Sequence, residues 1–183
     1  MDLLEYRNAI ISTVKARLPG LRACEPHAGR FDLDELKKIS TALPAVRIAI
    51  MGVPQVESDG DGCADNTLQV VMYCVAGNAP RLSASDACLN MVGFLTAFLT
   101  NGERWNLTNL SDPLKIGAEN LYNAPQGENA VCLWAVSFRQ IVRIGQSEFE
   151  SLPEFLAEAL YLGRAPEIGA DHVDDYVQIY PEE

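Results

Sequence analysis

A long strand with apolar residues on both sides constrains the fold of this chain more than any other feature. Residues 130–145 read "AVCLWAVSFRQIVRIG". Successive side chains of a strand point to opposite faces of a sheet. One face carries Cys132, Trp134, Val136, Phe138 and Val142. The other carries Leu133, Ala135, Ser137, Arg139, Ile141 and Arg143.

Two further strands are predicted before it. Residues 44–53, "PAVRIAIMGV", alternate in polarity and begin with a proline, where a missing N–H does least harm. Residues 66–77, "NTLQVVMYCVAG", form the second strand. Its most apolar face is formed by Leu68, Val70, Met72 and Cys74. The acidic loop between the two strands makes them a hairpin.

Two helices are expected around these strands. Residues 2–18 carry an apolar stripe at helical spacing, and "PG" at 19–20 ends it. A longer helix begins after Ser83, a typical N-cap residue with Asp86 three positions later. Its stripe consists of Ala84, Ala87, Cys88, Met91, Phe94, Leu95 and Phe98. We expect this stripe to pack on the sheet face that carries Ile48, Val70, Met72, Trp134 and Val136.

The order of elements predicts an α+β fold, with an antiparallel or mixed sheet of about four strands and helices packed mainly on one face. Residues 1–145 form the predicted domain, and residues 146–183 form a C-terminal extension. In the extension, Ser151 is expected to cap a short helix, and "DDYVQIYP" at 174–181 is expected to add a short edge strand. Residues 31–39, "FDLDELKKI", are interpreted as a short helix or turn, and 103–129 as an irregular stretch.

Composition limits the class of protein. Hydrophobic residues make up 48% and charged residues 21%, which is typical of a globular chain. No apolar run reaches the roughly 18 residues of a membrane-spanning helix, and the N-terminus does not resemble a secretory signal. The net charge of −11 argues against binding DNA by phosphate neutralisation, although an acidic wall can surround DNA without retaining it. Five scattered cysteines without a CxxC motif indicate reduced thiols and synthesis in the cytoplasm.

The loop "SDGDGCADNT", residues 58–67, superficially resembles a calcium site. An EF-hand loop that began at Asp59 would need an oxygen ligand at its fifth position, Gly at its sixth and Glu at its twelfth. Those positions hold Cys63, Ala64 and Val70. We therefore predict a mobile hairpin tip without tight metal binding, in which Gly60 and Gly62 supply positive φ angles.

No motif of an enzyme is present. The two histidines, His27 and His172, lack partners at metal-ligand spacing, and no nucleophile elbow, P-loop or dinucleotide fingerprint occurs. The prediction is a protein that is not an enzyme, with no catalytic residue, metal or cofactor. A small cytoplasmic enzyme or ligand-binding domain, with a site assembled from 103–129, is kept as an alternative.

The sheet face opposite the helices suggests a subunit contact. It is half apolar and carries arginines, as protein interfaces often do; a solvent face with partial loop cover is the alternative interpretation. In the predicted contact, the acidic hairpin of one subunit lies against the arginines of the next. The interface residues are Arg47, Met51, Val71, Tyr73, Arg139, Ile141 and Arg143 on the sheet face, with Glu57, Asp59, Asp61 and Asp65 on the hairpin.

The order of these elements resembles the tail terminator proteins of long-tailed bacteriophages. The resemblance is carried by the N-terminal helix, "LPAVRIAIMG", the acidic hairpin tip, "NTLQVVMYCVAG", "SASDACLNMVGFLTAFL" and "NAVCLWAVSFRQIVRIG". That family includes the lambda-type minor tail protein U and related proteins of Mu-like phages and prophages. The resemblance covers residues 1–145 and nothing beyond them.

The resemblance implies a structural virion protein that forms a hexameric ring on the tail tube, ends tail polymerisation and presents a surface for joining the head and neck. Its implied partners are further copies of itself, the tail tube protein and a head–neck connector protein. DNA would pass through the ring without specific binding, and no membrane is involved. The protein would act in the host cytoplasm during assembly and then in the virion tail. A neck or head-completion protein is the alternative within the same class.

Overall fold

The computed structural model describes residues 1–31, 42–58, 60, 62–123, 130–145, 160–162 and 177–180. The chain divides into two compact units, Met1–Gly145 and Gln146–Glu183. In the second unit, β6 (Leu160–Leu162) pairs antiparallel with β7 (Val177–Tyr180). The strand expected near the C-terminus is therefore present, but it pairs within its own two-stranded sheet and not at the edge of the main sheet. The helix predicted after Ser151 lies outside the described residues, and so does the helix or turn predicted at 31–39, apart from Phe31.

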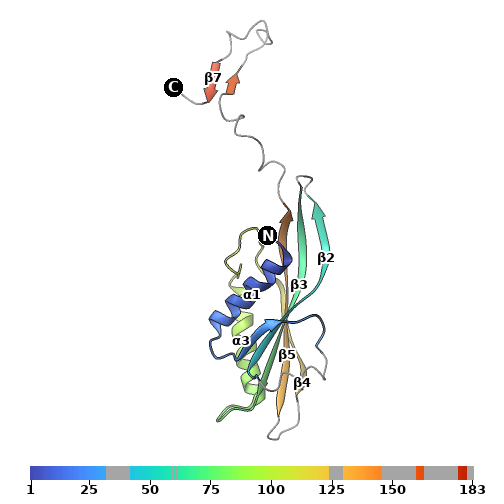
Figure 1. Cartoon of the computed structure of the whole chain (residues 1–183), viewed down its shortest axis with the longest axis vertical. Helices are drawn as coiled ribbons and strands as arrows, with labels where there is room; N and C mark the ends of the chain where they lie inside the picture. The colour runs from blue at the N-terminus through green and yellow to red at the C-terminus, as the bar shows by residue number, and fades with distance from the viewer. Residues whose placement is uncertain are drawn as a thin grey trace. The chain divides into compact units, whose positions relative to one another are not determined.

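The first unit contains a five-stranded mixed sheet with the order β1-β2-β3-β5-β4 (Figure 1). The strands are β1 (Ala23–Pro26), β2 (Ala45–Ser58), β3 (Cys63–Gly77), β4 (Leu114–Asn123) and β5 (Val131–Gly145). β1 runs parallel to β2, and every other neighbouring pair is antiparallel. The α+β prediction is confirmed, with five strands in place of about four.

The prediction of an irregular stretch over 103–129 is wrong for its middle, which forms β4. β4 is an edge strand whose residues are mostly exposed, so its apolar residues show no alternation for a sequence pattern to detect. A bulge at each end further breaks its register with β5.

β3 and β5 form the centre of the sheet. They pair without interruption from Cys63 opposite Gly145 to Gly77 opposite Val131. The face of the sheet that carries Val70, Met72 and Val136 packs under the helices and forms the main core. The opposite face forms a second, smaller core around Val75 and Leu133. β3 is thus buried on both sides from Val70 to Ala76, and β5 around Leu133 and Ala135, as the two-sided apolar pattern of 130–145 indicates.

Two helices cover the main core (Figure 1). α1 (Leu3–Arg17) is capped by Asp2, whose carboxylate accepts a hydrogen bond from the Glu5 amide at 2.7 Å. α3 (Ala84–Thr100) is capped by Ser83, whose hydroxyl accepts from the Asp86 amide at 3.1 Å and donates to the Asp86 carboxylate at 2.7 Å. α1 packs over β1 and β2, while α3 packs over β3, β5 and β4. The cap predicted at Ser83 is confirmed, while the Asp2 cap of α1 was not predicted.

The predicted stripe of α3 is partly wrong. The residues that the helix buries are Ala84, Cys88, Met91, Val92, Leu95 and Leu99. Phe94 is 37% exposed and lies at the border of the outward side, where its ring stacks on that of Phe98. The cause is the low polarity of the helix: with apolar residues on nearly every side, spacing alone does not determine which side faces the sheet.

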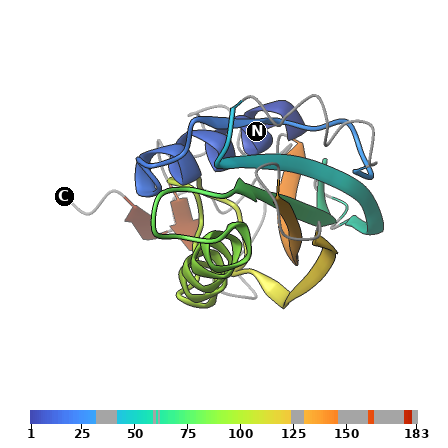
Figure 2. The ribbon, with the colours of Figure 1, turned by 90° about the horizontal axis from the view of Figure 1, so that it is seen from below.

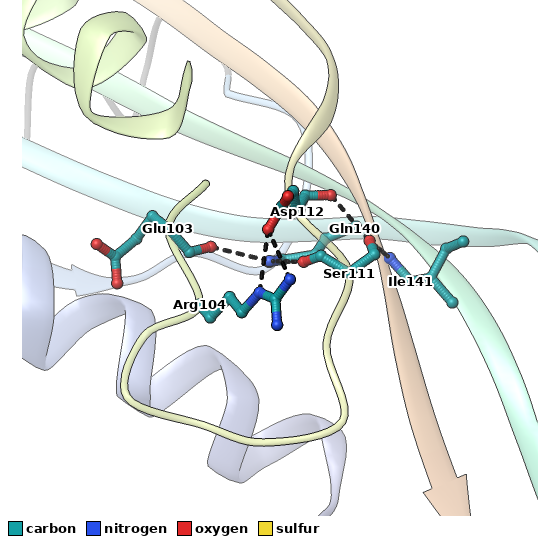
Figure 3. Close-up of polar contacts among 6 residues, drawn as sticks. All are labelled: Glu103, Arg104, Ser111, Asp112, Gln140 and Ile141. Carbon is teal, nitrogen blue, oxygen red and sulfur yellow. Dashed lines mark hydrogen bonds and ion pairs between the residues drawn. The ribbon is translucent and has the colours of Figure 1, made fainter. Parts of the chain in front are cut away.

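A single buried amide connects the sheet, α1 and the loop after α3. Gln140 on β5 is fully buried, and its side-chain oxygen accepts hydrogen bonds from the Tyr6 hydroxyl and the Trp105 indole, each at 2.7 Å. Burial raises the pKa of Tyr6, so its hydroxyl stays protonated and donates. The amide nitrogen of Gln140 donates to the carbonyls of Glu103 at 3.0 Å and Ser111 at 2.7 Å (Figure 3). All four hydrogen-bonding positions of the amide are therefore occupied.

The orientation of α3 can be tested by a pair of truncations. Leu95→Ala should lower the free energy of unfolding by about 2–5 kcal/mol, because it leaves a cavity at a fully buried position. Phe94→Ala should lower it by less than about 1 kcal/mol, because Phe94 lies at the surface. Urea denaturation measures both. Equal losses would contradict the described rotation of the helix.

The Gln140 contacts can be tested by a double-mutant cycle. Gln140→Leu should lower the free energy of unfolding by about 3 kcal/mol or more, because two buried donors lose their acceptor. Tyr6→Phe should cost about 1 kcal/mol in the wild type. In the Gln140→Leu background the same change should cost nothing or be stabilising, since it removes an unpaired hydroxyl. Equal costs in both backgrounds would show that the two side chains are not coupled.

Candidate assembly surface

Two residues of the proposed interface are buried by the chain itself. Tyr73 is 4% exposed and Val71 is 8% exposed, both in the second core. The Tyr73 hydroxyl donates to the Gly29 carbonyl at 3.2 Å, and the rings of His27 and Phe31 pack on Tyr73 at centroid distances of 5.5 and 5.2 Å. Tyr73 and Val71 therefore have little exposed surface to offer a neighbouring subunit, and their place in an interface stays a prediction. The segment after β1 covers them, which the alternation of a single strand does not reveal.

Arg47 is engaged inside the chain. β1 and β2 pair in a register that sets Glu25 beside Arg47, and the Arg47 guanidinium forms an ion pair with the Glu25 carboxylate. The Arg47 side chain is only 15% exposed. Its charge is neutralised locally, so it is not available for the acidic hairpin of another subunit.

Arg143 and Asp65 also pair within one chain. They lie opposite each other in the β3–β5 register, with the Arg143 Nη1 atom 3.5 Å from the Asp65 Oδ1 atom. Glu57 lies opposite Asp65 in the β2–β3 register, so the three charged residues form a row across three strands. The predicted attraction between acidic hairpin and basic strand exists, but within a subunit, because neighbouring strands bring these residues together.

The remaining predicted residues have mixed positions. Met51, Ile141 and Arg139 are half-buried on β2 and β5, and Arg139 lies opposite Gln69. Asp59 and Asp61 lie outside the described residues. Gly60 and Gly62 have φ angles of +75° and +86°, which confirms the positive φ predicted for the hairpin tip.

The outer half of β2 is a surface that the sequence analysis missed. β1 pairs with β2 only as far as Ile48, and from Gly52 to Ser58 every residue is exposed. Val53 and Val56 are 39% and 58% exposed there. This part of the hairpin extends past the helices (Figure 1). The predicted strand ended at residue 53. Val53 and Val56, on either side of Pro54, are the sequence signal that could have indicated that the strand continues.

The edge of this strand is partly protected. Pro54 has no N–H to offer to another strand, and register irregularities occur between Ile50 and Gly52 and between Gly52 and Gln55. Proline and bulges are the usual devices that prevent indiscriminate pairing of edge strands. The outer half of β2 therefore favours side-chain contacts over unrestricted extension of the sheet.

The thiols are poorly placed for nucleophilic chemistry. All five cysteines are buried, and none forms a disulfide. Burial raises the pKa of Cys24 to about 11 and that of Cys74 to about 12, and it also raises the pKa of Cys88. Because the thiolate is the reactive species, these three groups stay protonated and unreactive at neutral pH.

The titratable side chains of the loop after α3 are used in holding that loop. The Glu103 carboxylate accepts from the Trp105 amide at 2.7 Å, and Arg104 pairs with Asp112 at 3.0 Å (Figure 3). Across the residues with described positions, no group of three or more His, Cys, Asp or Glu side chains is arranged to hold a metal ion. Among the same residues, no helix is long and apolar enough to cross a membrane.

The intrachain ion pair generates a prediction about charge reversal. Arg143→Asp should lower the free energy of unfolding by up to about 1 kcal/mol. The substitution places a third carboxylate beside those of Glu57 and Asp65, and like charges repel at this partly exposed site. Adding Asp65→Arg to that variant should recover most of the loss. Urea denaturation at low salt measures both, with a smaller effect expected at high salt. A double variant no more stable than the sum of the single changes would contradict the pairing.

No protein-family model matches the chain, and a search of curated proteins found no match.

Proposed function

We propose that the protein is a structural phage protein that assembles as a ring on the tail tube, ends tail polymerisation and presents a surface for joining the head. The proposal begins from the resemblance of residues 1–145 to tail terminators. It is supported by the arrangement of the elements that carry this resemblance. α1, the β2–β3 hairpin, α3 and β5 belong to one unit, with both helices on one face of one sheet.

The observation that carries the proposal is the exposed outer half of β2. It presents two apolar side chains, Val53 and Val56, on a ribbon that no helix of the described residues covers. Apolar residues gathered at an uncovered strand are typical of contact surfaces, whereas single exposed apolar residues are common on any protein. A ring is built from heterologous contacts, in which one surface of each subunit meets a different surface of the next. The outer half of β2 supplies one such surface.

Charge is compatible with a ring through which DNA passes. The chain has a net charge of −11. Two of the arginines that the sequence placed on the sheet face are paired with carboxylates, Arg47 with Glu25 and Arg143 with Asp65. Uncompensated arginines and lysines are what holds phosphates. Neutralising these two arginines weakens the hold of this surface on phosphates, so that DNA can pass without being retained.

The proposed partners follow from the same role. They are further copies of the chain, the tail tube protein and a head–neck connector protein. Assembly would take place in the host cytoplasm and end in the virion tail. The protein acts through these contacts and not through catalysis.

The test is deletion of the gene in its phage, followed by electron microscopy of tail length. We expect overlong tails that carry no heads, and normal tails when the wild-type gene is restored. Complementation with Val56→Glu should fail, because it places a charge on the exposed β2 ribbon. Leu4→Glu is the matched control, since Leu4 is 59% exposed and lies on α1.

The outcomes separate the alternatives. Tails of normal length with unfilled or unstable heads would replace the terminator role with that of a neck or head-completion protein. Normal virions after deletion would exclude an assembly role. Restoration of normal tails by Val56→Glu would show that the outer half of β2 is not the contact surface.

A further inference from the structure

The outward side of α3 is an uncharged surface on an acidic protein. The exposed residues of the helix are Asp86, Leu89, Asn90, Gly93, Phe94, Ala97 and Thr100. Beyond Asp86 in the first turn, none of them carries a charge. Leu89 is 47% exposed and Phe94 is 37% exposed. Figure 2 shows α3 nearly end-on, with one side toward the strands and the other facing away from them.

Gly93 lies near the middle of this side and has no role in packing within the described chain. A Cβ atom added there would meet nothing within 4 Å. Glycine in the middle of a helix destabilises it relative to alanine. The described fold does not require a glycine at this position. Packing within the described part of one chain therefore does not account for the lower helix stability that Gly93 causes. Glycine does permit close approach of another backbone.

Electrostatics indicates which partner this surface fits. Two copies of a chain with a net charge of −11 repel each other over most of their surfaces. Contact between copies is least unfavourable where charge is absent, and α3 provides such a face. A basic partner would instead be drawn to the acidic parts of the surface. The uncharged face therefore favours a second copy of the chain.

We propose that two copies pair through the outward sides of α3, with the helices crossing at Gly93 about a two-fold axis. In an antiparallel crossing of this kind, residues equally spaced before and after Gly93 face each other. Leu89 of one copy then lies against Ala97 of the other, so a large side chain meets a small one on both halves of the contact. The contact is isologous and closes as a dimer, and it does not depend on the tail-terminator proposal.

The experiment measures the dimer by analytical ultracentrifugation of the full-length protein over a range of concentrations. We expect a concentration-dependent dimer. Gly93→Ala should raise the dimer dissociation constant at least tenfold, because two methyl groups separate the helices at the crossing. The same substitution should raise the midpoint of thermal unfolding at concentrations where the protein is monomeric, because alanine is the better helix former.

A matched control is Gly20→Ala, since Gly20 also has nothing within 4 Å of an added Cβ but lies in the turn after α1. It should leave the dissociation constant unchanged. Leu89→Glu should abolish the dimer without unfolding the protein, because Leu89 is exposed in the monomer. The dimer should also strengthen with salt, as the Debye length falls from about 30 Å at 0.01 M to about 3 Å at 1 M.

Several results would overturn the proposal. A protein that stays monomeric at its highest soluble concentration has no such contact. A dimer that keeps its affinity in Gly93→Ala or Leu89→Glu uses another surface. A dimer that weakens as salt is added is held by ion pairs, which this side of α3 does not supply.

Discussion

The fold depends on the hydrogen bonds of one buried side chain, Gln140. Its amide binds Tyr6 on α1 and Trp105 in the loop after α3, and it also holds two carbonyls of that loop. A buried amide is costly unless every hydrogen-bonding position is occupied. Because all of them are occupied here, the amide favours one arrangement of helix, loop and strand over other apolar packings. Segments far apart in sequence, at residues 6, 105 and 140, are thereby set at one point of the core.

The surface follows from the way the sheet is covered. The helices shield one face over most of its length, and the chain after β1 shields part of the other around Tyr73. β1 is only four residues long, so the outer half of β2, which pairs with β3 on one edge, has no strand partner on its other edge in the described chain. α3 has an apolar side that the sheet cannot bury, because a helix resting on a sheet buries only one side. These two uncovered surfaces are distinct. A heterologous ring needs two different contact surfaces on each subunit, whereas an isologous pair needs one surface that contacts its own copy.

Charge has a different role from the one that the sequence suggests. β2, β3 and β5 carry both acidic and basic residues. From the sequence, we expect these opposite charges to attract each other between subunits. Cross-strand register brings Asp65 to Arg143 and Glu25 to Arg47 inside one chain. Such partly exposed pairs contribute little stability, but they neutralise two of the three arginines predicted on this face. What is left for association is apolar surface, at Val53 and Val56 on β2 and at Leu89 and Phe94 on α3.

The sequence by itself determined the local structure of this protein. Alternating side chains located β2, β3 and β5, and cap residues located the start of α3 at Ser83, since these signals arise between residues near in sequence. It could not locate β4, which as an edge strand buries too little to show a period, nor the rotation of α3, whose low polarity leaves its buried side ambiguous. It also could not show that Tyr73 is covered or that Arg143 is paired, because both depend on residues distant in the chain. Only tertiary structure decides those contacts, since burial and ion pairing are set by distance in space, and the candidate interface changed for that reason.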